Sequence, residues 1–354
     1  MRVGVDKRIL YLKIPQSAFR NPNYEDLITF AREALRLPQS VPVELAPLEG
    51  RGSDRSYFRL KWDSDKSAIL VHYDPMRIEN TYYADIAGFL HNINVPVPRS
   101  IRHDRVRSLI LMEDLGNTDL WSLRKTPWET RQPLYQKTLA IVHKLHSFPE
   151  KDFPSERVRL MEPFGPDLYR WERDYFRDHF VRDVCGSKLE ALFAKELEEE
   201  LSSMAEQLSR TRRSLVHRDL QSQNVMIRDG EPFLIDFQGL RFGSPFYDLG
   251  SLLCDPYVEF SDDQRIDLLL YYYRLSEQNL AREDFQKLFW EASAQRLMQA
   301  LGAYGFLGLK KGLKSFLDHI PAGLRNLHHA ASQAPSLSRL LELVQRCQSV
   351  SRFD

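Results

Sequence analysis

The spacing of apolar residues along the chain changes near residue 117. Before that point, short runs with strand-like alternation lie between segments with helical spacing. The predicted helices span 24–35 and 79–90, and the predicted strands span 56–62, 67–73 and 108–112. Residues 63–66 have the composition of a turn, and the Val-Pro-Val-Pro run at 95–98 ends the second helix because proline cannot continue one.

After that point the spacing is mostly helical. Helices are predicted over 131–145, 168–180, 188–209, 262–275, 284–301 and 337–347. One strand-like island interrupts them at 215–246, and we find no internal repeat and no low-complexity linker. The pattern predicts an α+β fold with a strand-rich first third and a helical remainder that carries one β-hairpin.

The composition is that of an ordinary globular protein, with 43% hydrophobic and 28% charged residues. A length of 354 residues corresponds to about two domains, or to one domain with two lobes. Lys plus Arg and Asp plus Glu both number 49, so the formal net charge is zero. A neutral chain gives no simple electrostatic reason to expect a nucleic acid or an anionic membrane as a partner, and we expect neither.

The three cysteines, Cys185, Cys254 and Cys347, are widely spaced and form no CxxC motif. This argues against a disulfide framework and a cysteine-rich zinc site, and it suits a reducing cytoplasm. The first residues are charged and lack an apolar stretch of signal-peptide length. No uncharged apolar run reaches the roughly 18 residues of a spanning helix. We therefore expect a cytoplasmic protein.

The strand-like island contains a predicted hairpin with polar residues at its base. Asp229-Gly230 lies between two apolar runs, which is a strong hairpin signal. If the turn is centred on Gly230, Asn224 faces Asp236 across the ladder, where opposed Cβ atoms lie about 4.5–5.5 Å apart. An amide oxygen and a carboxylate at that separation can share a hard cation such as Mg²⁺.

Asp219 lies on the loop that enters this hairpin, five residues before Asn224, and a loop can aim it at the same point. Phosphoryl transfer needs such groups. Two ligands hold Mg²⁺ on the nucleotide phosphates, and a separate carboxylate orients and deprotonates the attacking hydroxyl. The alternative is an ordinary surface hairpin with polar neighbours. The combination of His-Arg-Asp, the Asn, the turn and Ile-Asp-Phe favours a phosphotransferase.

The segment His-Arg-Asp-Leu-Gln-Ser-Gln-Asn with Ile-Asp-Phe-Gln-Gly resembles the catalytic and metal-binding loops of the protein-kinase-like superfamily, on its aminoglycoside/choline phosphotransferase branch. The resemblance extends over residues 45–320. It implies a two-lobed protein-kinase-like fold, with a nucleotide-covering N-lobe (1–115) and a C-lobe (116–354) that holds the catalytic loop, metal site and acceptor site. The implied cofactors are ATP and Mg²⁺. The implied roles are catalysis by Asp219 and metal binding by Asn224 and Asp236.

The nucleotide side departs from the family pattern. Residues 48–60 stand where a phosphate-covering loop is expected, and His72 stands about where the family has a phosphate-binding Lys. A neutral His is a poorer phosphate ligand, but Arg55 or Arg59 can compensate, because guanidinium groups bind phosphate well. The residues that the resemblance implies for nucleotide binding are Gly52, Ser53, Arg55, His72, Glu113 and Leu115.

Other residues are expected to support the catalytic loop or to bind the acceptor. His217 and Asp248 are expected as supports, although Asp248 can equally be a helix N-cap. On the helix at 168–180, an aromatic ring and a carboxylate suit a sugar, but such aromatic residues can also belong to the core. The candidate acceptor-binding residues are Trp171, Glu172, Asp255 and Arg296.

Within the branch, the chain is similar to bacterial kinases that phosphorylate the anomeric hydroxyl of N-acetylmuramate or N-acetylglucosamine, at 53–60, 247–258 and 295–312. This implies the same reaction here, with a partly exposed Asp219 of ordinary carboxylate pKa as the base. Two alternatives stay open. One is a kinase for aminoglycosides or choline-like molecules, which the mixed charges of the helices disfavour. The other is a non-catalytic nucleotide-binding protein, which the intact catalytic and metal residues disfavour.

Overall fold

The computed structural model describes residues 23–48, 55–276 and 279–350, which belong to two compact units. The first unit contains residues up to Arg77 together with Ile101–Glu113. The second contains Ile78–Ser100 and the residues from Asp114 onward. The predicted lobe boundary at residue 115 stays a prediction.

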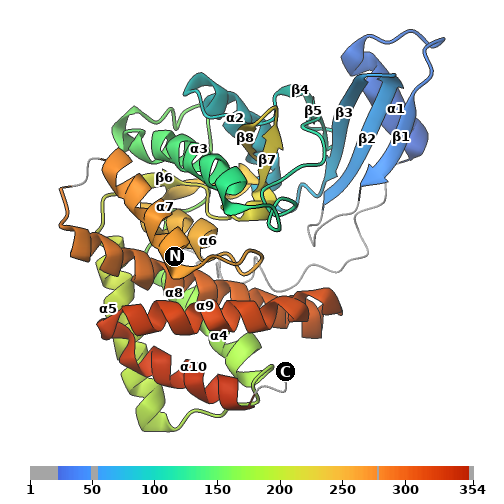
Figure 1. Ribbon diagram of the computed structural model, residues 1–354. Helices are drawn as coiled ribbons and strands as arrows, with labels where there is room; N and C mark the ends of the chain where they lie inside the picture. Colours follow the sequence, from blue (N-terminus) through green and yellow to red (C-terminus); the bar gives the residue numbers. More distant parts are fainter. Residues whose placement is uncertain (1–22, 49–54, 277–278, 351–354) are drawn as a thin grey trace, which may run out of the picture. The chain divides into compact units, whose positions relative to one another are not determined.

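A five-stranded sheet forms the first unit, in the order β1-β2-β3-β5-β4 (Figure 1). Its strands are β1 (Glu44–Leu48), β2 (Arg55–Asp63), β3 (Lys66–Tyr73), β4 (Ser100–Asp104) and β5 (Leu109–Glu113). The pairs β1–β2, β2–β3 and β3–β5 are antiparallel. Helix α1 (Tyr24–Leu35) packs Leu27, Phe30 and Ala31 against buried strand residues, so one apolar helix face closes the core of this unit.

The second unit is mostly helical and carries two short sheets, β6 with β9 and β7 with β8. Its helices are α2 (Ile78–Asn92), α3 (Trp128–Ser147), α4 (Pro166–Phe176), α5 (Ala191–Ser209), α6 (Pro245–Leu253), α7 (Asp262–Leu275), α8 (Arg282–Gly305), α9 (Ile320–Gln333) and α10 (Ser338–Val350). Its strands are β6 (Ser214–Val216), β7 (Val225–Arg228), β8 (Glu231–Leu234) and β9 (Arg241–Gly243). π-helical turns, Arg177–Arg182 and Phe306–Lys310, extend α4 and α8.

Helix α8 is the central helix of the second unit and packs against α4, α6 and α9 (Figure 1). It is buried on almost all sides, as expected for an internal helix. Two glycines permit close approach. A Cβ on Gly250 of α6 would lie 2.8 Å from the Cα of Ser293, and one on Gly302 would lie 3.0 Å from the backbone nitrogen of Phe176. Helices α4 and α6 therefore pack directly on the α8 backbone.

The sequence-based elements agree with this structure in most places. The predicted helices and strands before residue 117 are confirmed as α1, α2, β2, β3 and β5, and those after it as α3, α4, α5, α7, α8 and α10. The prediction missed β1, β4 and α9. Pro47 lies inside β1, an edge strand, which is where a sheet tolerates proline. In α9, Pro321 and Gly323 weaken the helical signal, and packing on α8 compensates.

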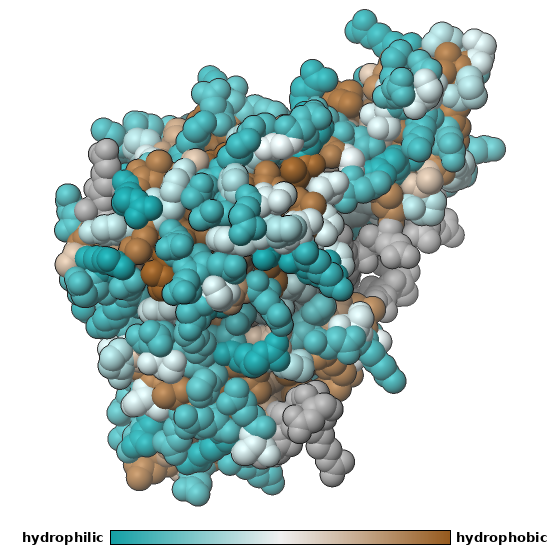
Figure 2. Space-filling model, in the orientation of Figure 1, coloured by the Kyte–Doolittle hydropathy of each residue, from teal (hydrophilic) through white to brown (hydrophobic). Residues whose placement is uncertain are grey.

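Hydrophilic residues cover most of the face that Figure 2 shows. Among the described residues, no helix combines the length and the apolar character that crossing a membrane requires.

Candidate active site

The loop between β6 and β7 carries His217, Arg218 and Asp219, and a buried carboxylate holds its backbone. Arg218 has a φ of 79°, a left-handed conformation that is uncommon for a residue with a side chain. Asp248 of α6 is fully buried and accepts the backbone N–H of His217 at 2.6 Å and that of Arg218 at 2.8 Å. Moving the loop would leave that buried carboxylate without its donors, so the conformation is held firmly.

Asp248 is itself held by neighbouring helices. His146 of α3 donates from Nε2 to Asp248 at 3.0 Å, and its Nδ1 lies 2.8 Å from the hydroxyl of Tyr272 on α7. The N-cap of α6 is Ser244, so Asp248 is not the helix cap that the sequence left open.

A second buried carboxylate holds the other end of the loop. Asp255 accepts from the backbone N–H of Ser222 at 2.7 Å and from its hydroxyl at 2.6 Å, and it also accepts from the backbone N–H of Tyr257. Burial raises the pKa of Asp255, against the opposing effect of these hydrogen bonds. The loop is therefore held by carboxylates at both ends.

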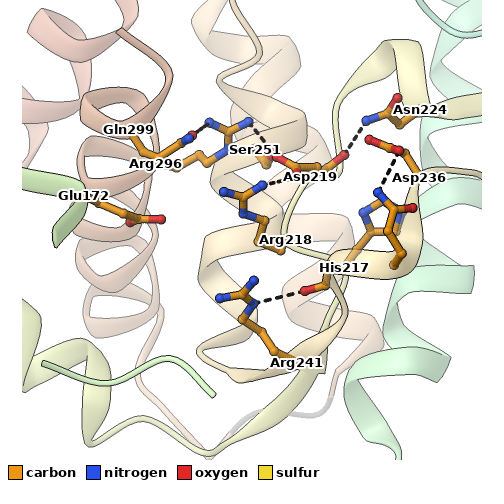
Figure 3. Close-up of polar contacts among 12 residues, drawn as sticks. Glu172, His217, Arg218, Asp219, Asn224, Asp236, Arg241, Ser251, Arg296 and Gln299 are labelled. Atoms are coloured by element: carbon orange, nitrogen blue, oxygen red, sulfur yellow. Dashed lines mark hydrogen bonds and ion pairs between the residues drawn. The ribbon is translucent and has the colours of Figure 1, made fainter. Parts of the chain in front are cut away.

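Two guanidinium groups contact the carboxylate of Asp219, one at each oxygen (Figure 3). Arg218 donates from Nη1 to Oδ2 at 2.5 Å, and Arg296 of α8 donates from Nη2 to Oδ1 at 3.4 Å. The Asp219 side chain is 22% exposed, so a hydroxyl group can reach it. Burial alone would raise the pKa of Asp219, but Arg218 and Arg296 outweigh it and hold the pKa below its ordinary value. The expectation of an ordinary pKa is wrong because of these two cations.

The hairpin register differs by one residue from the prediction. The pairing of β7 with β8 closes around a two-residue turn, Asp229-Gly230, in which φ is 54° and 74°. Two positive φ values are what a type I′ turn requires. The turn is therefore centred between these residues, and Ile235 lies opposite Asn224 in place of Asp236. The backbone N–H of Ile235 donates to the carbonyl of Asn224 at 3.0 Å.

Asn224 and Asp236 nevertheless lie on the same side of Asp219, at the base of the hairpin (Figure 3). Asn224 donates from Nδ2 to the carbonyl of Asp219 at 2.8 Å, which fixes the orientation of its amide. Asp236 has a left-handed backbone, with φ 62°, and its Oδ1 accepts from Gln238 at 3.0 Å. No cluster of three His, Cys, Asp or Glu that could enclose a metal occurs in the described ranges. One carboxylate and one amide oxygen fit a Mg²⁺ ion that phosphates also bind.

The loop that carries Asp219 is hydrogen-bonded directly to the segment that carries Asp236. His217 is buried, and its Nε2 donates to the carbonyl of Ile235 at 2.9 Å. On the other side of Asp236, the ring of Phe237 stacks on Tyr83 with the ring centroids 4.5 Å apart. His217 therefore joins the loop to the segment that carries Asp236, and its supporting role stays a prediction.

The predicted nucleotide-binding residues are only partly covered by the structure. Gly52 and Ser53 lie outside the described residues. Arg55 begins β2, Glu113 ends β5, and Leu115 is buried. Their contacts with a nucleotide stay predictions.

His72 lies in β3 and is buried. Burial lowers its pKa to about 4, although Asp74 opposes the shift. The imidazole is therefore neutral near pH 7 and does not supply the positive charge of the family lysine, so its binding of phosphate stays a prediction.

Two of the four candidate acceptor residues have their carboxylates bound inside the protein. Asp255 accepts hydrogen bonds from Ser222 on the loop that carries Asp219, as described above. Glu172 of α4 is 1% exposed and accepts from the Tyr247 hydroxyl at 2.7 Å and from Gln295 at 2.9 Å. Burial raises the pKa of Glu172. Both carboxylates are therefore engaged in hydrogen bonds within the protein.

The other two candidates are Trp171 and Arg296. The ring of Trp171 stacks on Tyr175 with centroids 5.2 Å apart. Arg296 contacts Asp219 and is itself oriented by Ser251, at 3.3 Å from Nε, and by Gln299, which accepts from Nη1. Their contacts with an acceptor stay predictions.

Sequence reasoning missed the neighbours that orient Arg296 and Glu172. Gln299 lies three residues after Arg296, so both are on one face of a predicted helix, and this spacing could have predicted their contact. Ser251, Tyr247 and Gln295 gave no local signal, because α4, α6 and α8 bring them together from distant parts of the chain.

The loop carboxylate, the amide that follows it and the carboxylate after the hairpin are the groups that phosphoryl transfer requires. Residues 44–285 match the phosphotransferase enzyme family, and the chain belongs to that family. It is therefore a small-molecule phosphotransferase, and membership of the family implies the use of ATP.

Curated relatives match most of the chain. The chain is 24% identical over 314 residues to the N-acetylmuramate/N-acetylglucosamine kinase of Pseudomonas aeruginosa, covering 86% of this chain and 88% of the relative. It is 24% identical over 301 residues to the enzyme of the same name from Neisseria meningitidis serogroup B, covering 82% and 87%.

Solved structures share the fold. A choline/ethanolamine kinase family protein from Mesorhizobium loti aligns with a TM-score of 0.59 at 17% identity, covering 90% of this chain and 99% of that one. The ADP-bound aminoglycoside phosphotransferase APH(2'')-Ib aligns with a TM-score of 0.56 at 14% identity, covering 88% and 100%. The predicted α+β, protein-kinase-like fold class is thereby confirmed.

Proposed function

We propose that this phosphotransferase transfers the γ-phosphoryl group of ATP to the anomeric hydroxyl of an amino sugar, such as N-acetylmuramate or N-acetylglucosamine, and that it requires Mg²⁺. The observation that carries the reaction type is the fixed, partly exposed Asp219 carboxylate beside Asn224 and Asp236. The acceptor is supported by the names of the curated relatives.

In this proposal Asp219 accepts the proton of the attacking hydroxyl. Because its pKa is lowered, Asp219 is a weak base, and it is ionised at neutral pH. A weak base works best on an acidic hydroxyl, or late in a loose transition state. The anomeric hydroxyl of a reducing sugar is more acidic than an ordinary alcohol, so it suits this carboxylate.

The metal would be held by the Asp236 carboxylate and the Asn224 amide oxygen, where it would neutralise charge on the phosphates. Two contacts fix Asp219 relative to these ligands. His217 donates to the carbonyl of Ile235, just before Asp236, and Asp248 accepts from the backbone of the loop that carries Asp219. Preorganised positions of this kind account for much of the catalysis of phosphoryl transfer.

The charges at Asp219 disfavour an aminoglycoside as the acceptor. Aminoglycosides are polycations, and they would have to bind beside the guanidinium groups of Arg218 and Arg296. Like charges at short range are repulsive, most strongly where water is excluded.

The test is a phosphorylation screen with ATP and Mg²⁺ against N-acetylmuramate, N-acetylglucosamine, an aminoglycoside and choline. Phosphorus NMR of the product shows a coupling to the anomeric proton only if the phosphate is at position 1. The matched methyl glycosides, which lack the free anomeric hydroxyl, should be inactive. Equal rates for a methyl glycoside and its free sugar would refute the anomeric assignment, and turnover of choline or the aminoglycoside alone would refute the acceptor class.

A further inference from the structure

Arg296 is a buried cation with little compensating negative charge. It is 5% exposed, and two of its partners, Ser251 and Gln299, are neutral. Among the described residues its charged partner is Asp219, at 3.4 Å, which is at the long end of the hydrogen-bond range. A buried charge is costly unless it is well paired. An anion that binds this guanidinium more closely than Asp219 does would therefore be stabilised there.

Asp219 does not fully neutralise the charge of Arg296, because the same carboxylate also pairs with Arg218. Its other oxygen is bound at 2.5 Å by Arg218. Figure 3 shows both guanidinium groups on one side of Asp219, with Asn224 and Asp236 on the other. The arginine side therefore lies away from the predicted metal ligands, where the part of the acceptor that does not react would lie.

Among the described residues, two further carboxylates, those of Asp255 and Glu172, interact with Arg296 at longer range, without a hydrogen bond or ion pair to it. Asp255 is occupied by the donors of Ser222 and Tyr257.

Glu172 is occupied as well. Its two oxygens accept from neutral donors, the Tyr247 hydroxyl and the Gln295 amide. Burial raises its pKa, which disfavours the ionised form.

We propose that Arg296 selects an acceptor that carries a carboxylate over the neutral sugar with the same ring, by exchanging its long contact with Asp219 for a charge-assisted hydrogen bond to that carboxylate. The proposal rests on the proposed function and deepens it, because it names an acidic amino sugar as the preferred acceptor.

Two acceptors make a matched pair for this proposal. N-acetylmuramate is N-acetylglucosamine with a lactyl ether on O3, and that ether carries the carboxylate. The amide of N-acetylmuramate keeps the size of the lactyl group and removes its charge, so it separates charge from shape.

The experiment measures kcat and KM of the full-length enzyme for these three acceptors, in the wild type and in Arg296→Gln. The wild type should prefer N-acetylmuramate. Arg296→Gln should lower kcat/KM for N-acetylmuramate roughly 10- to 100-fold more than for the two neutral acceptors, the range expected for one charge-assisted hydrogen bond. The selective part of the loss should be in KM. Arg282→Gln, an exposed arginine on the same helix, is the matched control.

A second variant keeps the proposal testable if Arg296→Gln does not fold. Gln299→Glu would give Arg296 an internal carboxylate at the position of its present amide partner. It should reduce the preference for N-acetylmuramate while N-acetylglucosamine is still phosphorylated.

The outcomes separate the two proposals. If the wild type phosphorylates no amino sugar, the proposed function is wrong and this inference is wrong with it. If amino sugars are phosphorylated but Arg296→Gln slows all three acceptors equally, the function stands and Arg296 acts on the base or the phosphate. A wild type that does not distinguish N-acetylmuramate from its amide overturns the inference in the same way.

Discussion

The carboxylate of Asp248 is expected to be the main support of the catalytic loop, and replacing it by Asn tests this. Asp248 has no exposed surface and accepts from the backbone of His217 and Arg218 and from the imidazole of His146. Asn has nearly the same shape but presents one oxygen and one NH₂ group. Whichever way the amide is turned, its NH₂ group faces at least one N–H donor.

The magnitude follows from the donors that lose their acceptor. A hydrogen bond to a charged group contributes about 1.5–3 kcal/mol, and a buried donor left without an acceptor costs about 1–3 kcal/mol more. If the Asn oxygen keeps the donors of His217 and His146, the Arg218 N–H is lost. We therefore expect Asp248→Asn to lower the free energy of unfolding by about 3–5 kcal/mol, the range seen when a buried charged pair is broken.

Urea denaturation with an unchanged slope measures this loss, and steady-state kinetics measure its effect on the loop. Asp219 is two residues from His217, so kcat should fall well before nucleotide affinity does. Asp267→Asn, on an exposed part of α7, is the matched control and should change stability by less than about 0.5 kcal/mol. An Asp248→Asn enzyme with wild-type stability and wild-type kcat would show that the loop does not depend on this carboxylate.

Three further predictions concern the other carboxylates. Asp236→Asn should abolish Mg²⁺-dependent turnover and Asn224→Ala should reduce it less, because only the first variant removes a charged ligand. Turnover measured as a function of Mg²⁺ concentration checks this, and a near-normal Asp236→Asn enzyme contradicts it. Asp219→Asn should keep nucleotide affinity and lose roughly 10²–10⁴-fold in kcat. In the wild type, kcat/KM should fall on the acid side only below the ordinary carboxylate range, because the pKa of Asp219 is lowered. Glu172 has a raised pKa, so its contribution to stability is complete below the ordinary glutamate pKa and is lost as pH rises through the raised value. The melting temperature of Glu172→Gln relative to wild type should therefore rise from acid to neutral pH, and a difference independent of pH would contradict the assignment.

The local chemistry of the catalytic loop could be predicted from sequence because its groups are close together in the chain. The Asp-Gly turn, the Asn and the Asp all lie within one short segment, and that segment does form a loop and a hairpin. The register was missed by one residue, because the prediction centred the turn on Gly230, whereas an Asp-Gly pair typically fills a two-residue turn. The left-handed backbone of Asp229 and Gly230 decides that, and it moves Asn224 opposite Ile235.

The electrostatics of Asp219 could not be predicted in the same way. Arg296 reaches it from α8, 77 residues along the chain. No periodicity places that contact, because it depends on how α8 packs on α6 and α4. The lowered pKa of Asp219, which depends on Arg296 as well as Arg218, was therefore missed, although both arginines were visible in the sequence.

Helix α6 and the residues after it link the catalytic loop to Arg296. Asp248 holds one end of the loop, and Asp255 holds the other. Ser251, on the same helix, orients Arg296, and the absence of a side chain at Gly250 brings α6 against the backbone of α8. The base and the arginine that we assign to the acceptor are therefore positioned by one helix, so a change in how α6 packs on α8 alters both at once. A short motif therefore predicts the reaction type, because its groups are close together in the chain. The position of the arginine that we assign to the acceptor depends instead on packing between helices that are far apart in sequence.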